Sequence, residues 1–108
     1  MQIRFEKVCK EVLASNARGI LICKYSHGIT IAANKNRGIY ASTCWNETSA
    51  KMARADSNTN VLCLSGMLTG PEEAEKIAQT WLSSPFSTEE RHARRTDKIK
   101  ELEKRNFK

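Results

Sequence analysis

The stretch "ILICKYSHGITIAANK", residues 20–35, decides the fold. Together with Gly19, its first four residues form a short apolar run without polar alternation, which is typical of a β-strand covered on both faces. A turn follows Cys23, and the small residues of 28–35 predict a short helix. We therefore expect a thiol at the point where a buried strand ends and a helix begins.

Short apolar runs and amphipathic segments alternate along the rest of the chain. Between Phe5 and Leu13, apolar residues recur at the i, i+3, i+4, i+7, i+8 spacing of one helix face. The predicted strands are 19–23, 38–44 and 61–64, and the predicted helices are 3–15, 28–35, 47–56, 71–82 and a terminal one from about residue 87.

Capping signals support three of these helix starts. Asn46 is a suitable N-cap for the helix over 47–56. Gly70 followed by Pro71 has the order of an N-cap and a proline in the first turn. Ser87 with Glu90 three residues later predicts a capping box at the start of the terminal helix.

The order of these elements predicts the fold class. Buried strands that alternate with helices indicate a parallel sheet with helices on both faces, a doubly wound, Rossmann-like α/β fold. The length of 108 residues predicts one domain, residues 1–108. Ligands of such sheets bind at the carboxyl ends of the strands, where Cys23, the corner 44–46 and the corner 65–66 are expected. One edge of so narrow a sheet is expected to need a partner.

Composition limits the function classes. The net charge is +6 and 40% of the residues are hydrophobic, which permits an anionic partner without defining it. No apolar run has the length needed to cross a bilayer, and the opening "MQIRFEKVCKEV" alternates charged and apolar residues, unlike a signal peptide. A cytoplasmic protein without a membrane partner is therefore predicted.

The four cysteines form no Cys-x-x-Cys pair and have no histidine at metal-ligand spacing. A zinc site is therefore not expected. Cys9, Cys44 and Cys63 lie in or beside apolar runs, and we expect them to pack as small hydrophobic side chains. Cys23 is the exception, because it ends a strand.

Three motifs in order carry a family resemblance. The runs "GILIC....GITIAANK...GI", "SAKMAR..SNTNVL" and "PFS.EERHARR..KI..LE" closely resemble the type B ribose-5-phosphate isomerases and, more distantly, the galactose-6-phosphate isomerase subunits. The resemblance implies a doubly wound dimer with active sites at the subunit interface. It implies interconversion of aldose and ketose phosphates through an enediolate, with neither a metal nor an organic cofactor.

The resemblance assigns roles to particular residues. Cys23 corresponds to the general base of many family members, and a thiol at the positive end of a helix loses its proton more readily than elsewhere. Arg91 and Arg95 match the arginines that bind the substrate phosphate, and their i,i+4 spacing places both on one helix face. Arg94 and Lys98 are expected to be surface charges.

The turn after Cys23 departs from the family pattern. Family members have Gly-Thr/Ser-Gly there, and the backbone N–H groups of this turn surround the developing oxyanion. This chain has Lys24, Tyr25 and Ser26, and only the later Gly28 remains as a substrate-binding glycine. Glycine suits such a turn because it adopts positive φ. Loss of the backbone cradle is therefore expected.

A second departure concerns the segment before the third strand. The family has a histidine and an asparagine there, used in ring opening and in stabilising the enediolate. Asp56 and Ser57 stand at these positions, as a candidate proton carrier and a candidate substrate contact. His92 belongs to the arginine motif, and His27 is expected to be exposed.

The family fold begins with a strand–helix–strand portion bearing an Asp-His pair, and no part of this sequence matches it. We expect a shortened family member that acts on a phosphorylated sugar as a homodimer, its catalysis weak or lost. The alternative is a non-catalytic module that binds a phosphosugar or nucleotide. Nucleic-acid binding is disfavoured because acids interrupt the basic segment 89–108 and no aromatic platform accompanies it.

Overall fold

The computed structural model describes the backbone of residues 2–107 and the side chains of residues 5–107. Three parallel strands form one sheet in the order β1-β3-β2, where β1 is Gly19–Cys23, β2 is Ala41–Thr43 and β3 is Val61–Ser65. The helices are α1 (Gln2–Ser15), α2 (His27–Ala33), α3 (Glu47–Ala55), α4 (Pro71–Ser83) and α5 (Glu90–Asn106).

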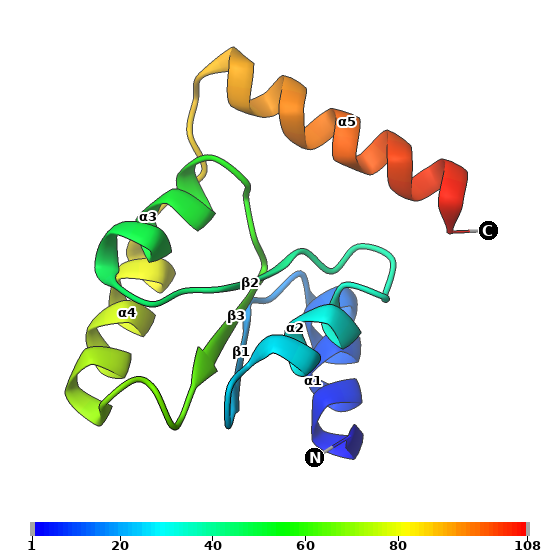
Figure 1. Ribbon diagram of the computed structural model, residues 1–108. Helices are drawn as coiled ribbons and strands as arrows, with labels where there is room; N and C mark the ends of the chain where they lie inside the picture. The colour runs from blue at the N-terminus through cyan, green and yellow to red at the C-terminus, as the bar shows by residue number, and fades with distance from the viewer. Residues whose placement is uncertain (1, 108) are drawn as a thin grey trace.

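Helices cover both faces of the sheet, as predicted for a doubly wound fold (Figure 1). All five residues of the central strand β3 are buried, because each face of the strand meets a helix layer. Val61 and Cys63 belong to the core shared with α1 and α2, whereas Leu62 and Leu64 belong to the core shared with α3 and α4. The period-two alternation of a strand thus divides one apolar run between two cores.

Three cysteines pack in these cores, which confirms the sequence-based expectation. Cys9, Cys44 and Cys63 are no more than 2% exposed, and burial raises the pKa of each thiol. Their role is that of small apolar side chains. Cys23 is half-buried at the end of β1.

Two predicted helix starts are confirmed and one is wrong. The Asn46 side chain accepts from the backbone N–H of Ser49 at 2.8 Å and completes a capping box, and Pro71 begins α4 after Gly70. The predicted box of Ser87 and Glu90 does not form. Ser87 Oγ instead accepts from the backbone N–H of Glu89 at 3.0 Å, so α5 begins at Glu90.

The predicted strand 38–44 is shorter in the structure, and Gly38 lies in a turn that precedes it. Gly38 has φ 87, and its N–H donates to Glu103 Oε2 at 2.8 Å, away from the sheet. The Tyr40 N–H donates to Asn60 Oδ1 at 2.8 Å. Only Ala41–Thr43 pairs with β3.

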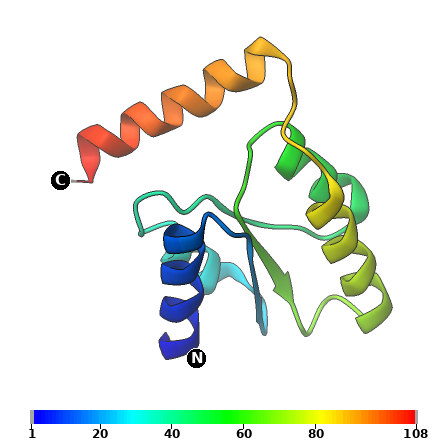
Figure 2. The same cartoon turned by 180° about the vertical axis from the view of Figure 1, so that it is seen from behind.

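The terminal helix α5 extends across the end of the sheet at which the strands begin (Figures 1 and 2). Its contacts agree with this position, because it meets segments that precede β2 and β3. Tyr40 O–H donates to Glu103 Oε1 at 2.9 Å, and Asp56 lies beside His92. α5 and the carboxyl end of β1 therefore lie at opposite ends of the sheet.

None of the helices within residues 2–107 is long and apolar enough to span a membrane.

Candidate functional site

Cys23 lies at the carboxyl end of β1, where the loop after β3 holds the strand end in place. The Gly66 N–H donates to the carbonyl of Cys23 at 2.8 Å, and Ser65 Oγ donates to the carbonyl of Lys24 at 2.6 Å. These bonds join the ends of two neighbouring strands. The thiol is therefore carried by a rigid part of the backbone.

The turn after Cys23 retains a left-handed residue although its glycines are replaced. Ser26 has φ 66 and ψ −3 and is only 2% exposed. Its Oγ lies 3.1 Å from Thr43 Oγ1, and its carbonyl accepts from Thr30 Oγ1 at 2.6 Å. Ser26 thus has positive φ without being a glycine, and these side-chain hydrogen bonds hold the turn; the loss of the backbone cradle stays a prediction. Lys24 and Tyr25 are exposed and add bulk beside it.

Gly28 lies in the first turn of α2 at the same end of the sheet. It is exposed, and an added Cβ would meet no atom within 4 Å. The fold therefore does not require glycine at this position, which leaves room for a ligand. His27 is exposed as expected, and its ring lies 6.5 Å from that of Trp45, which follows β2.

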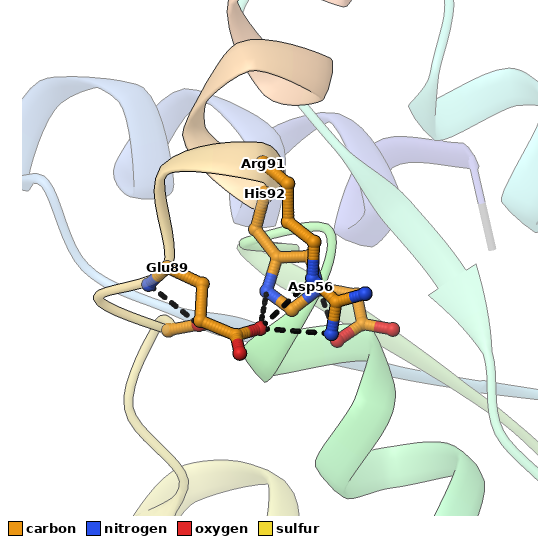
Figure 3. A network of polar contacts seen from close by, with 5 residues as sticks. Asp56, Glu89, Arg91 and His92 are labelled. Atoms are coloured by element: carbon orange, nitrogen blue, oxygen red, sulfur yellow. Dashed lines mark hydrogen bonds and ion pairs between the residues drawn. The ribbon is translucent and has the colours of Figure 1, made fainter.

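A second group of predicted residues gathers at the start of α5 (Figure 3). His92 is buried between two carboxylates, with Nε2 3.4 Å from Asp56 Oδ1 and Nδ1 3.5 Å from Glu89 Oε2. The Nδ1 contact lacks hydrogen-bond geometry. Arg91 Nε and Nη2 both donate to Glu89 Oε2 at 3.0 Å. Asp56 thus faces the arginine motif, and Glu89 occupies the guanidinium fork.

The sequence-based predictions missed Glu89. Glu89 stands two residues before Arg91, but in the sequence it is only one of the acids that interrupt the basic segment 89–108. The pair is exposed, with side chains 61% and 56% accessible. An ion pair so exposed contributes less than about 1 kcal/mol, so a phosphate dianion could displace Glu89 from Arg91.

Ser57 and Arg95 lie at this same end of the sheet. Ser57 is exposed and lines a hollow of about 20 Å³ with Thr96 and Ile99 of α5. Arg95 is exposed and lies one helical turn after Arg91. Arg94 and Lys98, which were predicted to be surface charges, are exposed as well.

The six predicted site residues therefore form two groups at opposite ends of one sheet. Cys23 and Gly28 lie where the strands end. The other group lies around α5, where the strands begin, and consists of Asp56, Ser57, Arg91 and Arg95. Within one chain, the candidate base Cys23 does not meet the candidate phosphate-binding residues Arg91 and Arg95.

A model of the ribose/galactose isomerase family matches residues 3–99 of the chain. The chain belongs to this family. Ribose-5-phosphate isomerase B of Escherichia coli K12 is 40% identical over 87 residues, which cover 81% of this chain and 58% of that protein. The probable ribose-5-phosphate isomerase B of Mycoplasma genitalium is 43% identical over 86 residues, covering 80% and 56%. The chain thus spans less than three fifths of both of these family members.

Solved structures of family members share the fold. The type B ribose 5-phosphate isomerase of Leishmania infantum superposes with a TM-score of 0.91 at 35% identity, over 94% of this chain and 67% of the other. The Mycoplasma genitalium ribose-5-phosphate isomerase B with bound ribulose-5-phosphate superposes with a TM-score of 0.86 at 38% identity, over 93% and 66%. The three-stranded sheet and its helices are therefore the part that this chain shares with the family.

Among the described residues, no cluster of three or more His, Cys, Asp or Glu side chains is arranged to hold a metal ion. The candidate side chains are a thiol at one end of the sheet, and arginines with a carboxylate at the other.

Proposed function

We propose that this protein is an aldose–ketose isomerase of phosphorylated sugars, of the ribose 5-phosphate to ribulose 5-phosphate type, whose site is shared between two copies of the chain. Family membership supports the reaction class. The separation of Cys23 from Arg91 supports the sharing, because one chain places them at opposite ends of its sheet. A homodimer in which each α5 reaches the Cys23 end of its partner unites the two groups.

The proposed chemistry moves one proton between neighbouring carbons. The Cys23 thiolate removes the proton from the carbon next to the aldehyde, and the electron pair shifts to form an enediolate. Return of the proton to the former carbonyl carbon, with transfer of the hydroxyl proton from the second oxygen to the first, yields the ketose, so no oxidant or reductant is consumed. Arg91 and Arg95 hold the phosphate, with Arg91 exchanging Glu89 for the dianion. Asp56, beside His92, transfers the proton of ring opening.

The turn after Cys23 determines how fast this reaction runs. Ser26 keeps the left-handed backbone of a glycine turn, but exposed Lys24 and Tyr25 restrict the approach of an oxyanion to the backbone. Loss of one oxyanion donor slows related reactions by roughly a hundredfold to a thousandfold. We therefore expect slow turnover of ribose 5-phosphate.

An isomerase assay tests this proposal. Ribulose 5-phosphate formation should be measurable at high protein concentration and should disappear in Cys23→Ala. Cys44→Ala is the matched control, because that thiol is buried in the core that the sheet shares with α3 and α4, and its loss affects stability alone. No turnover by the unaltered chain, or equal turnover with and without the Cys23 thiol, would refute the catalytic proposal.

A second candidate is a non-catalytic module that binds a phosphosugar or nucleotide, and replacement of the turn glycines by Lys24 and Ser26 favours it. Such a module binds phosphate through Arg91 and Arg95 but does not transfer a proton. Ribose 5-phosphate then raises the melting temperature, and Cys23→Ala leaves that increase unchanged. Loss of the increase in Arg91→Gln would assign the binding to these arginines. The cytoplasmic location and the dimer stay predictions, the latter testable by sedimentation.

A further inference from the structure

A hollow of about 440 Å³ opens at the end of the sheet where the strands begin. Three cationic side chains line it, Arg18, Arg54 and Lys100. Three amide side chains line it as well: Asn16, Asn58 and Asn60. No Asp or Glu of the described chain is part of the lining, and the volume is within the range of small-molecule sites, roughly 300–1,000 Å³.

Arg54 is the unusual member of this lining, because it is buried without a carboxylate partner among the described residues. Only 5% of the residue is exposed. Its guanidinium donates to three neutral oxygens: Ser84 O at 3.1 Å, Asn58 Oδ1 at 2.9 Å and Thr59 O at 2.6 Å. A buried charge is normally paired, so this arrangement leaves a positive charge uncompensated.

Arg18 adds a second positive charge at the same place. Its Nη1 donates to Leu82 O at 2.9 Å, and its guanidinium carbon lies 5.9 Å from the Trp81 ring centre. Burial, and secondarily the charge of Arg18, lower the pKa of Arg54. Both guanidinium groups line the same hollow, so each adds positive charge to it.

Contacts within the protein offset only part of the positive charge of this lining. Leu82 and Ser84 lie at the carboxyl end of α4, where the helix dipole offers the equivalent of about half a negative charge. Among the residues that the structure describes, one carboxylate, that of Glu103, hydrogen-bonds residues of the wall: its two oxygens accept from the Gly38 N–H and the Tyr40 O–H. These partners do not balance the positive charge of the three cationic side chains, which favours binding of an anion.

We propose that this hollow is a phosphate site that takes a phosphate monoester, separate from the site proposed at Cys23 and Arg91. A dianion matches the number of uncompensated cations better than a carboxylate does. Its tetrahedral oxygens suit two guanidinium forks together with neighbouring amide donors. The site needs neither turnover nor a second chain, because all its lining residues belong to one copy.

Amide chemical shifts in the isotopically labelled full chain test the proposal. Inorganic phosphate, ribose 5-phosphate and adenosine 5′-monophosphate are the three probes. Saturable shifts are expected at the amides of Asn16, Gly38, Asn58 and Asn60, with binding about tenfold weaker in Arg18→Gln or Lys100→Gln. Lys98→Gln, an exposed lysine on the same helix, is the matched control and should leave the affinity unchanged.

The three probes distinguish the source of the phosphate. Equal binding of all three assigns recognition to the phosphate group alone, and tighter binding of either ester assigns the sugar phosphate or the nucleotide. Arg91→Gln with Arg95→Gln removes the other proposed grip and should leave these shifts intact. Absence of saturable shifts at these amides, or shifts unaffected by both Arg18→Gln and Lys100→Gln, overturns the proposal. If Arg18→Gln fails to fold, the exposed Lys100 carries the test.

Discussion

At the residue scale, a few backbone positions set the turns around both ends of the sheet. Ser26 is left-handed in the turn after β1, and Gly38, with φ 87, is left-handed in the turn before β2. The two differ in what stabilises them. Ser26 has hydrogen bonds to Thr43 and Thr30, whereas at Gly38 an added Cβ would lie 2.8 Å from Leu13 Cδ2.

Gly38→Ala should destabilise the protein by about 1–2 kcal/mol, because alanine is strained at positive φ and its Cβ would displace Leu13. Gly28→Ala is the control: nothing lies within 4 Å of the new Cβ, and a helical alanine gains up to about 1 kcal/mol. Urea unfolding measures both free energies. Equal effects of the two substitutions would contradict this account of Gly38.

Tyr40 makes the free energy of unfolding depend on alkaline pH. Burial and the hydrogen bond to Glu103 raise the pKa of Tyr40 to about 12 from 10.0. The native state therefore keeps a proton that the unfolded chain loses, so this stabilisation is complete below pH 10 and is lost as the pH rises towards 12.

Tyr40→Phe should cost about 1 kcal/mol at neutral pH and should flatten the decline of stability between pH 10 and 12. Denaturant unfolding across this range is the measurement. Tyr25→Phe, at an exposed phenol, should keep the decline of the unaltered chain. A decline that persists in Tyr40→Phe would assign it to other groups.

At the scale of elements, α5 is joined to the rest of the molecule mainly through polar contacts. Near its end, Glu103 accepts hydrogen bonds from Gly38 and Tyr40. Near its start, His92 lies beside Asp56, and the Ser87 N–H donates to Ala55 O at 3.0 Å. Its residues Ile99 and Leu102 are 46% and 48% exposed. An element held by so few contacts opens more easily than a core helix.

Glu103→Ala should remove both contacts at the end of α5 and cost about 2–3 kcal/mol locally, since hydrogen bonds to a charged acceptor are the stronger kind. Hydrogen exchange should accelerate at the Gly38 amide and along α5, with β3 unaffected. Glu101→Ala, at an exposed position of the same helix, should leave exchange unchanged. Uniform acceleration across the sheet would instead indicate global destabilisation.

At the scale of the whole molecule, the sheet separates the two groups of candidate residues. One end carries Cys23 and the other carries Arg91, and β3 runs between them through both cores. A side chain cannot cross a packed sheet, so a site that uses both groups needs two copies of the chain. The free side of β1, where Ile22 is 65% exposed, adds to the surface that a single copy leaves uncovered.

A mixture of two inactive variants should therefore recover activity. In an equal mixture of Cys23→Ala and the double variant Arg91→Gln, Arg95→Gln, half of the dimers are heterodimers. Each heterodimer has one intact site, so about a quarter of the unaltered turnover is expected. Turnover of ribose 5-phosphate after mixing and refolding is the measurement. The control mixes Cys23→Ala with a chain carrying all three substitutions and stays inactive. A first mixture no more active than this control would place both groups in one site of one chain.

Much of the fold was predictable from local signals. The apolar run at Gly19–Cys23 and the N-caps at Asn46 and Gly70 are properties of short segments, and they appear in the structure as predicted. The family motifs likewise identified Cys23 and Arg91 as candidates before any coordinates. Segments whose partners are distant in sequence were predicted less well. The Gly38 N–H donates to Glu103, which is distant in sequence, and the strand predicted over 38–44 begins only at Ala41. The predicted capping box fails for a local reason, because Ser87 Oγ accepts from the Glu89 N–H.

The sequence by itself determined the order of elements, the doubly wound class and the family, because periodicity, capping and motif spacing act over a few residues. Only the tertiary structure decided that the Gly38 N–H bonds Glu103, that Ser26 holds a glycine-like turn, and that Arg54 is buried in a hollow shared with Arg18. It also placed Cys23 and Arg91 at opposite ends of the sheet. These outcomes depend on contacts between residues far apart in the chain, which packing brings together and local pattern does not encode.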